Sequence, residues 1–261
     1  MHIGGIINAI SSLDPIGLDA IGSVRFMNRF DTKYVFSIKK IGDLISILDG
    51  KYKVLHINNL RTFPYHTTYF DTPDYMFYYQ HLRGELERNK IRYRKYENTG
   101  TSFLEIKKKT NKRRTIKWRI LNKHSPGSFD DPAVDFIREY LPINLTLLKP
   151  VLINRFTRTT LIGLESNERI TLDYNISFSE TANGEQTELP YLAVVELKKE
   201  GFSRCSLFNN LIKQLNIHPT GFSKYCIGNA ILNDFLRKNM IKPKLLLLNK
   251  IENKYHRSYS C

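Results

Sequence analysis

Residues 89–96 read NKIRYRKY, and this stretch decides which fold the sequence predicts. It has the alternation of a β-strand, in which neighbouring side chains point to opposite faces of the sheet. One face carries Ile91 and Tyr93. The other face is entirely cationic and consists of Lys90, Arg92 and Arg94. An ordinary half-buried strand turns such a face to water, so the fold depends on how many other strands share the pattern.

At least four other predicted strands also have one apolar and one charged face. The charged faces carry Asp31 and Lys33; Glu105, Lys107 and Lys109; Lys117 and Arg119; Arg169 and Asp173; Glu196 and Lys198. In a sandwich these charges would be solvated, and the strand pattern alone favours that arrangement. In a barrel they would line the lumen, which is costly unless counter-charges and water fill it. A barrel of this kind would serve to hold a highly charged ligand.

The composition indicates a globular protein with a polyanionic partner. The 261 residues include 41% apolar residues, and 40 Lys and Arg against 25 Asp and Glu give a net charge of +15. Nucleic acid, an anionic membrane or a phosphate-rich small molecule would each fit that charge. The three cysteines, Cys205, Cys226 and Cys261, lack CxxC spacing. They argue against a disulfide framework or structural zinc site and favour a reducing compartment, so we expect a cytoplasmic protein.

The chain shows no repeat and no low-complexity linker, which predicts one domain with terminal additions. Residues 1–24 form an amphipathic segment without the basic start of a signal peptide. This segment would dock to another protein or pack against the domain. The domain itself covers residues 25–238, and residues 239–261 form a basic, loosely held tail. No apolar run approaches the ~20 residues that a membrane-spanning helix needs.

Apolar periodicity and turn residues predict the elements of this domain. The predicted strands cover residues 25–37, 52–57, 63–72, 89–97, 101–109, 113–121, 150–163, 168–179 and 191–200. The predicted helices cover residues 38–50, 73–84, 131–141, 203–215 and 223–238. Pro73 is expected in the first turn of its helix and Gly84 just beyond the end. Asp71 is interpreted as a residue that ends a strand and caps this helix.

Two glutamates in the charged faces need partners if they are buried. Glu196 lies in the apolar run AVVELKK, where it could pair with Lys198 or an arginine, or offer a hard oxygen ligand to a divalent cation. Glu105 could assist the metal or form an ion pair with Lys107 or Arg94. Residues 112–114 are most simply a solvated hairpin tip, although they could also steer a polyanion towards a binding site.

Eight short motifs occur in a distinctive order: MNRFDTKYVFS, YFDTPD, IRYRKY, SFLEIKKK, RFTRTTL, RITLD, VVELK and FSKYCIG. From about Arg25 to Leu236 the sequence resembles the VTC (vacuolar transporter chaperone) domain. That domain is the polyphosphate polymerase branch of the triphosphate tunnel metalloenzyme (CYTH-like) superfamily. The resemblance implies an α+β fold: an antiparallel, eight-stranded tunnel barrel with a basic lumen, surrounded by helices.

The resemblance also implies a set of site residues. A divalent metal, Mn²⁺ or Mg²⁺, would be held by Glu196. Phosphate groups would be bound by nine cations: Lys33, Arg92, Arg94, Lys107, Lys117, Arg158, Arg169, Lys198 and Lys224. All but the last two of these would also act in catalysis. The family pattern has a further basic residue three positions before Lys224, where this chain has Gly221.

The implied function is that of a metal-dependent phosphotransferase, a polyphosphate polymerase that uses ATP. The alternatives are a triphosphatase of the same fold, with water as acceptor, and a non-catalytic polyphosphate or nucleic-acid binding module. Nucleic-acid binding would place aromatic residues on the cationic strand faces. Tyr93 and Trp118 lie on the apolar faces instead, so no nucleic-acid partner is expected. Association with a membrane or a partner protein stays open.

Overall fold

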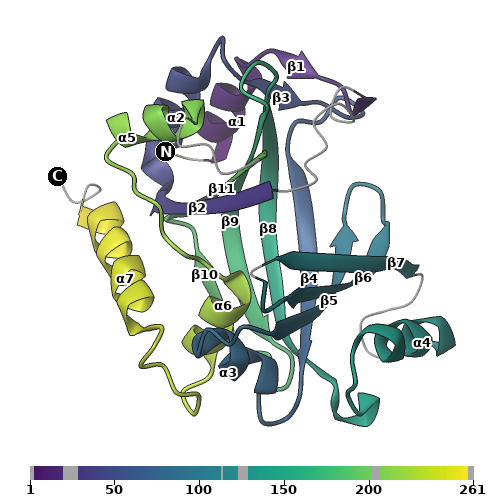
Figure 1. The fold of residues 1–261 in the computed structure, drawn as a ribbon. Coiled ribbons are helices and arrows are strands. Elements are labelled where there is room, and N and C mark those ends of the chain that lie inside the picture. The colour runs from purple at the N-terminus through teal and green to yellow at the C-terminus, as the bar shows by residue number, and fades with distance from the viewer. Residues whose placement is uncertain (1–2, 20–28, 113, 123–128, 201–205, 258–261) are drawn as a thin grey trace.

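The computed structural model describes residues 3–19, 29–112, 114–122, 129–200 and 206–257. Its centre is an antiparallel sheet whose main path has eight strands in the order β2-β11-β9-β8-β4-β5-β6-β7 (Figure 1). In chain order these strands are β2 (Arg29–Ser37), β4 (Phe63–Asp71), β5 (Arg88–Tyr96), β6 (Ser102–Lys109), β7 (Thr115–Asn122), β8 (Lys149–Gly163), β9 (Glu168–Glu180) and β11 (Leu192–Glu200). Of the strand predicted at residues 25–37, the part from residue 29 on is β2, and residues 25–28 lie outside the described residues.

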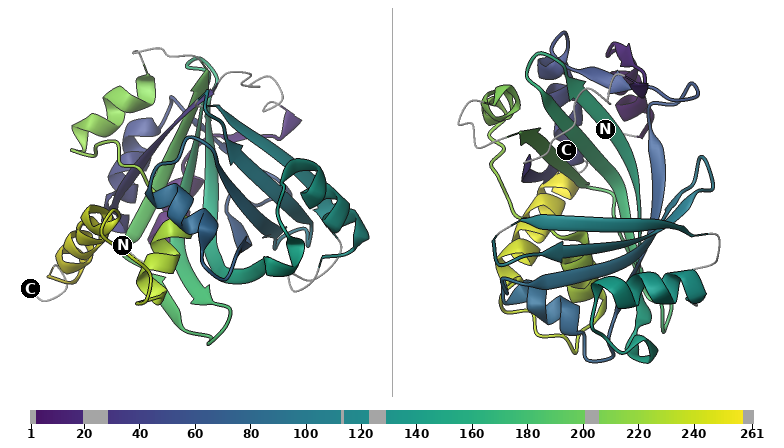
Figure 2. Two further views of the ribbon diagram at one scale, coloured as in Figure 1. Left: turned by 60° about the horizontal axis from the view of Figure 1, so that its bottom comes forward. Right: turned by 45° about the vertical axis from the view of Figure 1, so that its right-hand side comes forward.

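The sheet curls so strongly that β5, β6 and β7 run across the front of β8 and β9 (Figures 1 and 2). Three short strands extend it: β1 (Pro15–Ile16) pairs with β3 (Lys53–Leu55), and β10 (Gln186–Leu189) pairs with β9. The curl places the charged strand faces inside and the apolar faces outside. This is the barrel-like arrangement and not the sandwich.

Helices cover the apolar outer faces and the ends of the sheet. They are α1 (Ile3–Ser11), α2 (Ile41–Leu48), α3 (Met76–Leu82), α4 (Asp131–Tyr140), α5 (Leu207–Gln214), α6 (Lys224–Leu232) and α7 (Lys242–Arg257), with 3₁₀ turns η2 (Ile38–Lys40) and η3 (Leu145–Leu147). One core cluster joins α1, α2 and α5 to β2, β9 and β11. A second lies among α3, α6, α7 and β8, and a third joins α4 to β5 and β6. Ile91 and Tyr93, the apolar face of NKIRYRKY, are buried in this third cluster.

Strand pairing does not close the sheet among the described residues, because β2 and β7 are the two ends of its path. Residues 219–223 bridge part of the open side. The backbone N–H of Thr220 donates to the carbonyl of Lys33 at 2.6 Å, and the Lys33 ammonium donates to the carbonyl of Phe222 at 2.9 Å. From β5, the Lys90 ammonium donates to the hydroxyl of Ser223 at 3.1 Å. This segment therefore ties the edge strand β2 to β5.

Asp71 has the capping role that the sequence predicts. Its carboxylate accepts hydrogen bonds from the backbone N–H groups of Thr72, Phe77 and Tyr78 at 2.8–2.9 Å. It also accepts one from the Tyr225 hydroxyl, which ties α6 to the start of α3. α6 can lie close to the sheet because residue 228 is glycine. A Cβ there would come within 2.7 Å of Leu152 and Phe178.

The terminal segments differ in how well the sequence predicts them. The amphipathic N-terminal segment forms α1, and Ile6 and Ile10 are buried against the domain. The prediction of a loosely held C-terminal tail is wrong, because residues 242–257 form the helix α7. Its residues Leu248 and Ile251 lie three positions apart and are buried together in the core. The run LLLL and the surrounding lysines hide this spacing in the sequence.

Two helix boundaries also need correction. α3 starts at Met76 and not near Pro73, because Tyr75 adopts a left-handed conformation with φ of 57° immediately before it. Gly84 lies beyond the end of the helix, as predicted, with φ of 67°. α6 ends at Leu232, six residues before the predicted end. Among the described residues, no helix is both long and apolar enough to cross a membrane.

Candidate functional site

The concave side of the sheet encloses a cavity of about 580 Å³. The structure brings all ten predicted site residues to its wall: Lys33, Arg92, Arg94, Lys107, Lys117, Arg158, Arg169, Glu196, Lys198 and Lys224. Lys90 and Arg119 line it as well, so eleven Lys and Arg face two carboxylates, Asp173 and Glu196. Strand register produces this concentration. In β5, β6 and β7, for example, Lys90, Lys107 and Lys117 lie side by side.

Glu105 lies on the inner face of the sheet, beneath the cationic side chains of β5 and β7 that it organises. Its side chain is 1% exposed and lies 2.6 Å from the guanidinium of Arg92 and 3.9 Å from that of Arg94. The Lys117 ammonium donates to its other oxygen. Burial alone would raise the pKa of this carboxyl, but the three cations hold it well below its usual range. Of the two ion pairs predicted for Glu105, the one with Arg94 is present, whereas Lys107 is not a partner.

Asp173 forms a second such centre. Its carboxylate accepts two parallel hydrogen bonds from Arg158, at 2.6 and 2.7 Å, and a third from Lys224. Burial favours its neutral form, but Arg158 and Lys224 outweigh burial and lower the pKa of Asp173 far below its usual range. A bidentate pair fixes both the position and the orientation of the guanidinium. β8, β9 and α6 are thereby joined at the cavity wall.

Glu196 is the third centre and the predicted metal ligand. Its carboxylate lies 2.5 Å from the Lys198 ammonium and 3.9 Å from that of Lys33. Desolvation opposes its charge, but these cations hold the pKa of Glu196 well below its usual range, so it is ionised near neutral pH. Among the described residues there is no group of three His, Cys, Asp or Glu that could hold a metal. A single carboxylate nevertheless fits Mg²⁺, which is commonly held by one or two carboxylates together with phosphates and water.

Three other cations of the cavity are less compensated by carboxylates. Arg94 is 9% exposed, and its nearest described carboxylate, Glu105, is 3.9 Å away. Burial, then Arg92 and Arg158, lower the pKa of this guanidinium, which still stays charged. Burial and neighbouring cations also lower the pKa of Lys90 to about 8 and that of Lys107 to about 7. The cavity therefore has a surplus of positive charge that a polyanion would stabilise.

These lowered pKa values predict how anion binding depends on pH. Lys90 and Lys107 lose their protons as the pH rises through 7–8, so the affinity for inorganic tripolyphosphate without metal should fall between pH 7 and 9. The charged groups near Lys107 are Arg92, Lys33 and Lys90, which lower its pKa. Glu196 acts in the opposite direction and raises it. Binding of tripolyphosphate at pH 8 should therefore be accompanied by proton uptake at these two lysines. Titration calorimetry in buffers of different ionisation enthalpy would measure this uptake.

Comparison with Lys107→Met isolates the effect of the lysine from the titration of the ligand. The variant should take up fewer protons at pH 8 and should show a flatter pH profile than the wild type. Equal proton uptake by both proteins would contradict the assignment of a lowered pKa to Lys107.

Aromatic residues on the cavity wall are the part of the site that the sequence interpretation missed. Tyr65, Tyr69, Tyr96 and Phe156 line the cavity among the cations. The rings of Tyr65 and Phe156 are stacked 5.2 Å apart, and the Arg158 guanidinium lies 5.2 Å from each ring centre. The expectation that aromatics avoid the cationic faces holds for Tyr93 and Trp118 but not for the sheet as a whole. Phe156 and Arg158 are two positions apart in one strand and therefore share a face, so strand alternation would have revealed these aromatic residues.

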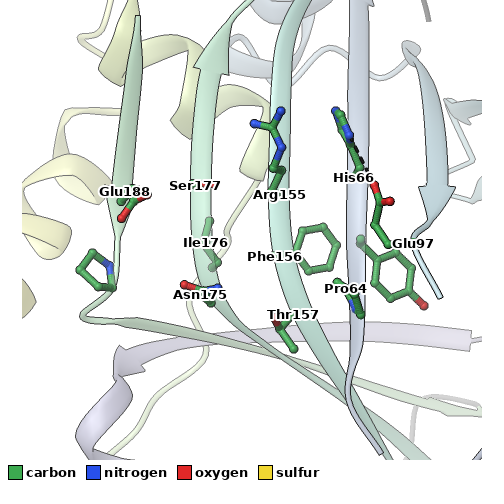
Figure 3. Close-up of a pocket in the computed structure, with 12 residues that line it drawn as sticks. Pro64, His66, Glu97, Arg155, Phe156, Thr157, Asn175, Ile176, Ser177 and Glu188 are labelled. Atoms are coloured by element: carbon green, nitrogen blue, oxygen red, sulfur yellow. Dashed lines mark ion pairs between the residues drawn. The ribbon is translucent and has the colours of Figure 1, made fainter. Parts of the chain in front are cut away.

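A second pocket, of about 400 Å³, shares Tyr65 and Phe156 with the cavity but contains none of the ten predicted site residues. Figure 3 shows Glu188, Ser177, Arg155 and His66 side by side on neighbouring strands of the sheet. Strand alternation places His66 on the opposite side of β4 from Tyr65. His66 lies 3.6 Å from Glu97, and the pocket mixes both signs of charge. This pocket lacks the cation surplus of the central cavity.

Two further predictions concern residues outside the cavity. Lys112 and Arg114 are exposed at the β6–β7 turn, which agrees with a solvated hairpin tip, while residue 113 lies outside the described residues. At Gly221, where the VTC pattern has a basic residue, an added Cβ would lie 3.7 Å from the Lys244 ammonium. Lys244 of α7 therefore brings its ammonium group close to Gly221, which has no side chain of its own.

The chain matches no curated protein. It is similar in structure to candidate adenylate cyclases from Vibrio parahaemolyticus (12% identity, TM-score 0.46, covering 76% of this chain and 96% of that one) and Bacillus halodurans (17%, 0.45, 75% and 94%). It is also similar to a candidate adenylyl cyclase from Hippeastrum described as having a dominant triphosphatase activity (12%, 0.42, 78% and 96%).

The VTC domain family matches residues 28–233, which include every strand of the curled sheet's main path and all ten predicted residues of the cavity wall. The predicted tunnel-type fold is therefore confirmed, although β2 and β7 do not pair with each other in the part of the chain that the structure describes. The chain belongs to the VTC domain family.

Proposed function

We propose that this protein binds the triphosphate group of ATP in the central cavity and transfers the γ-phosphoryl group to a polyphosphate chain. One observation carries the proposal: eleven cationic side chains line a single cavity that contains two carboxylates. Each carboxylate there is already bound to cations, and Arg94, Lys90 and Lys107 add charge with little compensation. A triphosphate, with about four negative charges near neutral pH, complements this surplus. Arg supplies paired donors to phosphate oxygens and Lys supplies point charges.

In the reaction, a terminal oxygen of the acceptor chain attacks the γ-phosphorus of ATP. A new P–O bond forms to the chain, and the bond between the γ-phosphorus and the β,γ-bridging oxygen breaks. ADP leaves with the electron pair of that bond, and the chain grows by one phosphate. Such transfers need positioning and charge stabilisation and little covalent chemistry from the protein. Arg92 and Arg94 from β5 and Arg158 from β8 would hold the transferred group.

The divalent cation that the family implies would be held by Glu196. When bound, it supplies positive charge to oxygens of the phosphate chain. Lys198 and Lys33 flank this carboxylate and keep it ionised over the neutral pH range. In the same region Lys107 faces Glu196 from β6. Mn²⁺ and Mg²⁺ both prefer oxygen ligands of this kind, so the proposal covers either ion.

The triphosphatase alternative uses the same cavity and differs only in the acceptor, which is water. Incubation with ATP and Mn²⁺ or Mg²⁺, with ADP, phosphate and long-chain polyphosphate followed together, separates the two. Polyphosphate formed along with ADP would support the polymerase. Phosphate and ADP without polymer would assign the triphosphatase. If tripolyphosphate binds but no product forms, the cavity is a receptor and the enzymatic proposal is wrong.

Glu196→Gln should separate metal binding from phosphate binding. The variant keeps the size of the side chain but loses the charge that would hold the metal, so metal-dependent turnover should fall by at least 10²-fold. Metal-free binding of tripolyphosphate should instead be retained or tighten, because Lys33 and Lys198 are released from the carboxylate. Calorimetry with and without Mn²⁺ would measure both. Loss of metal-free binding would contradict the role of Glu196 as metal ligand.

A further inference from the structure

We infer that Tyr96, together with Phe103 and Arg119, forms a nucleobase-stacking subsite at the rim of the cavity. This inference rests on the proposed function, because it assigns the donor to nucleoside triphosphates and gives the base a place beside the phosphate site. The three residues come from neighbouring strands β5, β6 and β7. Tyr96 and Arg119 line the cavity, and Tyr96 directly follows the cationic strand face of Arg92 and Arg94.

The rim cluster is a row of neighbouring aromatic rings set at an angle to one another, 57° between Tyr65 and Tyr96 and 87° between Tyr96 and Phe103. The Tyr96 ring lies 4.9 Å from that of Tyr65, which faces it across the β4–β5 pair, and 6.0 Å from that of Phe103. The exposed Arg119 guanidinium lies over the Phe103 ring at 4.7 Å. Aromatic rings and arginine planes are the groups on which proteins stack nucleic-acid bases. A base leaving the phosphate cavity at this rim would meet such a surface.

The other aromatic residues of the wall have a different role. Tyr65 and Phe156 stack on each other, and cations lie over their rings: Arg94 at 5.5 Å over Tyr65, and Lys224 at 4.5 Å over Phe156. These rings hold the phosphate-binding cations in place. Among the cation–π contacts of the described residues, none involves Tyr96, which is half-buried at the cavity. Tyr65 and Phe103 pack against this ring, and the part of it that lines the cavity is where a ligand would stack.

Phosphate groups alone give no reason for this apolar surface. A triphosphate or polyphosphate chain has no π-face, and the ring of Phe103 cannot donate a hydrogen bond to it. Stacking depends on the area of the base more than on the hydrogen-bonding groups at its edges. We therefore expect the subsite to favour purine over pyrimidine nucleotides and to distinguish ATP from GTP only weakly.

The test compares Tyr96→Leu and Tyr96→Phe with the wild type, using calorimetric titration with ATP, GTP, CTP and inorganic tripolyphosphate in the same buffer. Tyr96→Leu should weaken ATP and GTP binding about tenfold, the loss expected for one stacked base, and CTP binding by less. Tripolyphosphate binding should stay within about twofold. Tyr96→Phe keeps the ring and should bind all four ligands like the wild type.

Arg119→Gln provides a second variant on an exposed residue, where misfolding is not expected. It should weaken ATP binding more than tripolyphosphate binding. An equal loss of ATP and tripolyphosphate affinity in Tyr96→Leu would overturn the inference, since Tyr96 would then only support the cation-binding rings. Equal affinity of the wild type for ATP and CTP would also overturn it. If the wild type binds no tripolyphosphate, the proposed function itself fails and this inference fails with it.

Discussion

Arg94→Ala is expected to lower kcat/KM for ATP by about 10²–10³-fold, the usual cost of removing one group that stabilises developing charge. Arg94 faces the cavity with its nearest described carboxylate 3.9 Å away, whereas Arg92 and Arg158 are held by carboxylates at 2.6–2.7 Å. Of these three arginines, Arg94 is thus the one whose positive charge is most available to a phosphate group. Because Arg94 is surrounded by like charges, its removal should change the free energy of unfolding by no more than ~1 kcal/mol.

Arg155→Ala is the matched control for this prediction. Arg155 is an exposed arginine on β8 that lines the second pocket and not the cavity. Steady-state kinetics should show wild-type activity for Arg155→Ala, and denaturant unfolding should show that both variants are folded. Wild-type activity in Arg94→Ala, or an equal loss in both variants, would contradict the assignment of the cavity as the reaction site.

Glu105→Gln is expected to lower the free energy of unfolding by about 3 kcal/mol, as is typical when one partner of a buried ion pair is removed. Arg92, Arg94 and Lys117 would then face one another without their shared carboxylate. The pKa of Glu105 is depressed in the folded state, so its contribution is present above the carboxyl's ordinary pKa and is lost as the pH falls. Urea unfolding at pH 7 measures the effect.

A bound polyanion should restore part of this lost stability, because it supplies the missing negative charge to the same cations. Tripolyphosphate should therefore raise the unfolding midpoint of Glu105→Gln more than that of the wild type. Glu87→Gln removes an exposed partner of Lys108 at 3.7 Å and should leave stability unchanged. If Glu105→Gln is as stable as Glu87→Gln, the ion-pair cluster does not hold this wall of the cavity together.

The cationic residues of the cavity wall could be predicted from the sequence because strand alternation is a local property. Once Lys90, Arg92 and Arg94 are placed on one face, the register of β5, β6 and β7 brings Lys107 and Lys117 beside them. What alternation cannot decide is which face lies inside. A sandwich and a barrel share the same pattern, and the choice depends on sheet curl, which is set by long-range packing. The family resemblance made that choice, and the structure agrees with it.

The parts that the sequence did not reveal depend on contacts between distant segments. Leu248 and Ile251 become a buried helix face only because the rest of the domain offers a surface for α7. Asp173 was seen as a charged residue of β9, but its bond to Lys224 depends on α6 reaching the cavity from fifty residues away. The aromatic residues Tyr65 and Phe156 of the cavity wall were missed for a simpler reason: they lie in strands whose alternation was not followed on both faces.

The most direct test of the central claim is a calorimetric titration of the wild type with inorganic tripolyphosphate, without metal, alongside Arg94→Ala and Arg155→Ala. We predict binding of one tripolyphosphate per chain that weakens with added salt, is reduced at least tenfold in Arg94→Ala and is unchanged in Arg155→Ala. Absence of binding to the wild type, or binding that depends on Arg155 and not on Arg94, would show that the cavity is not a triphosphate site.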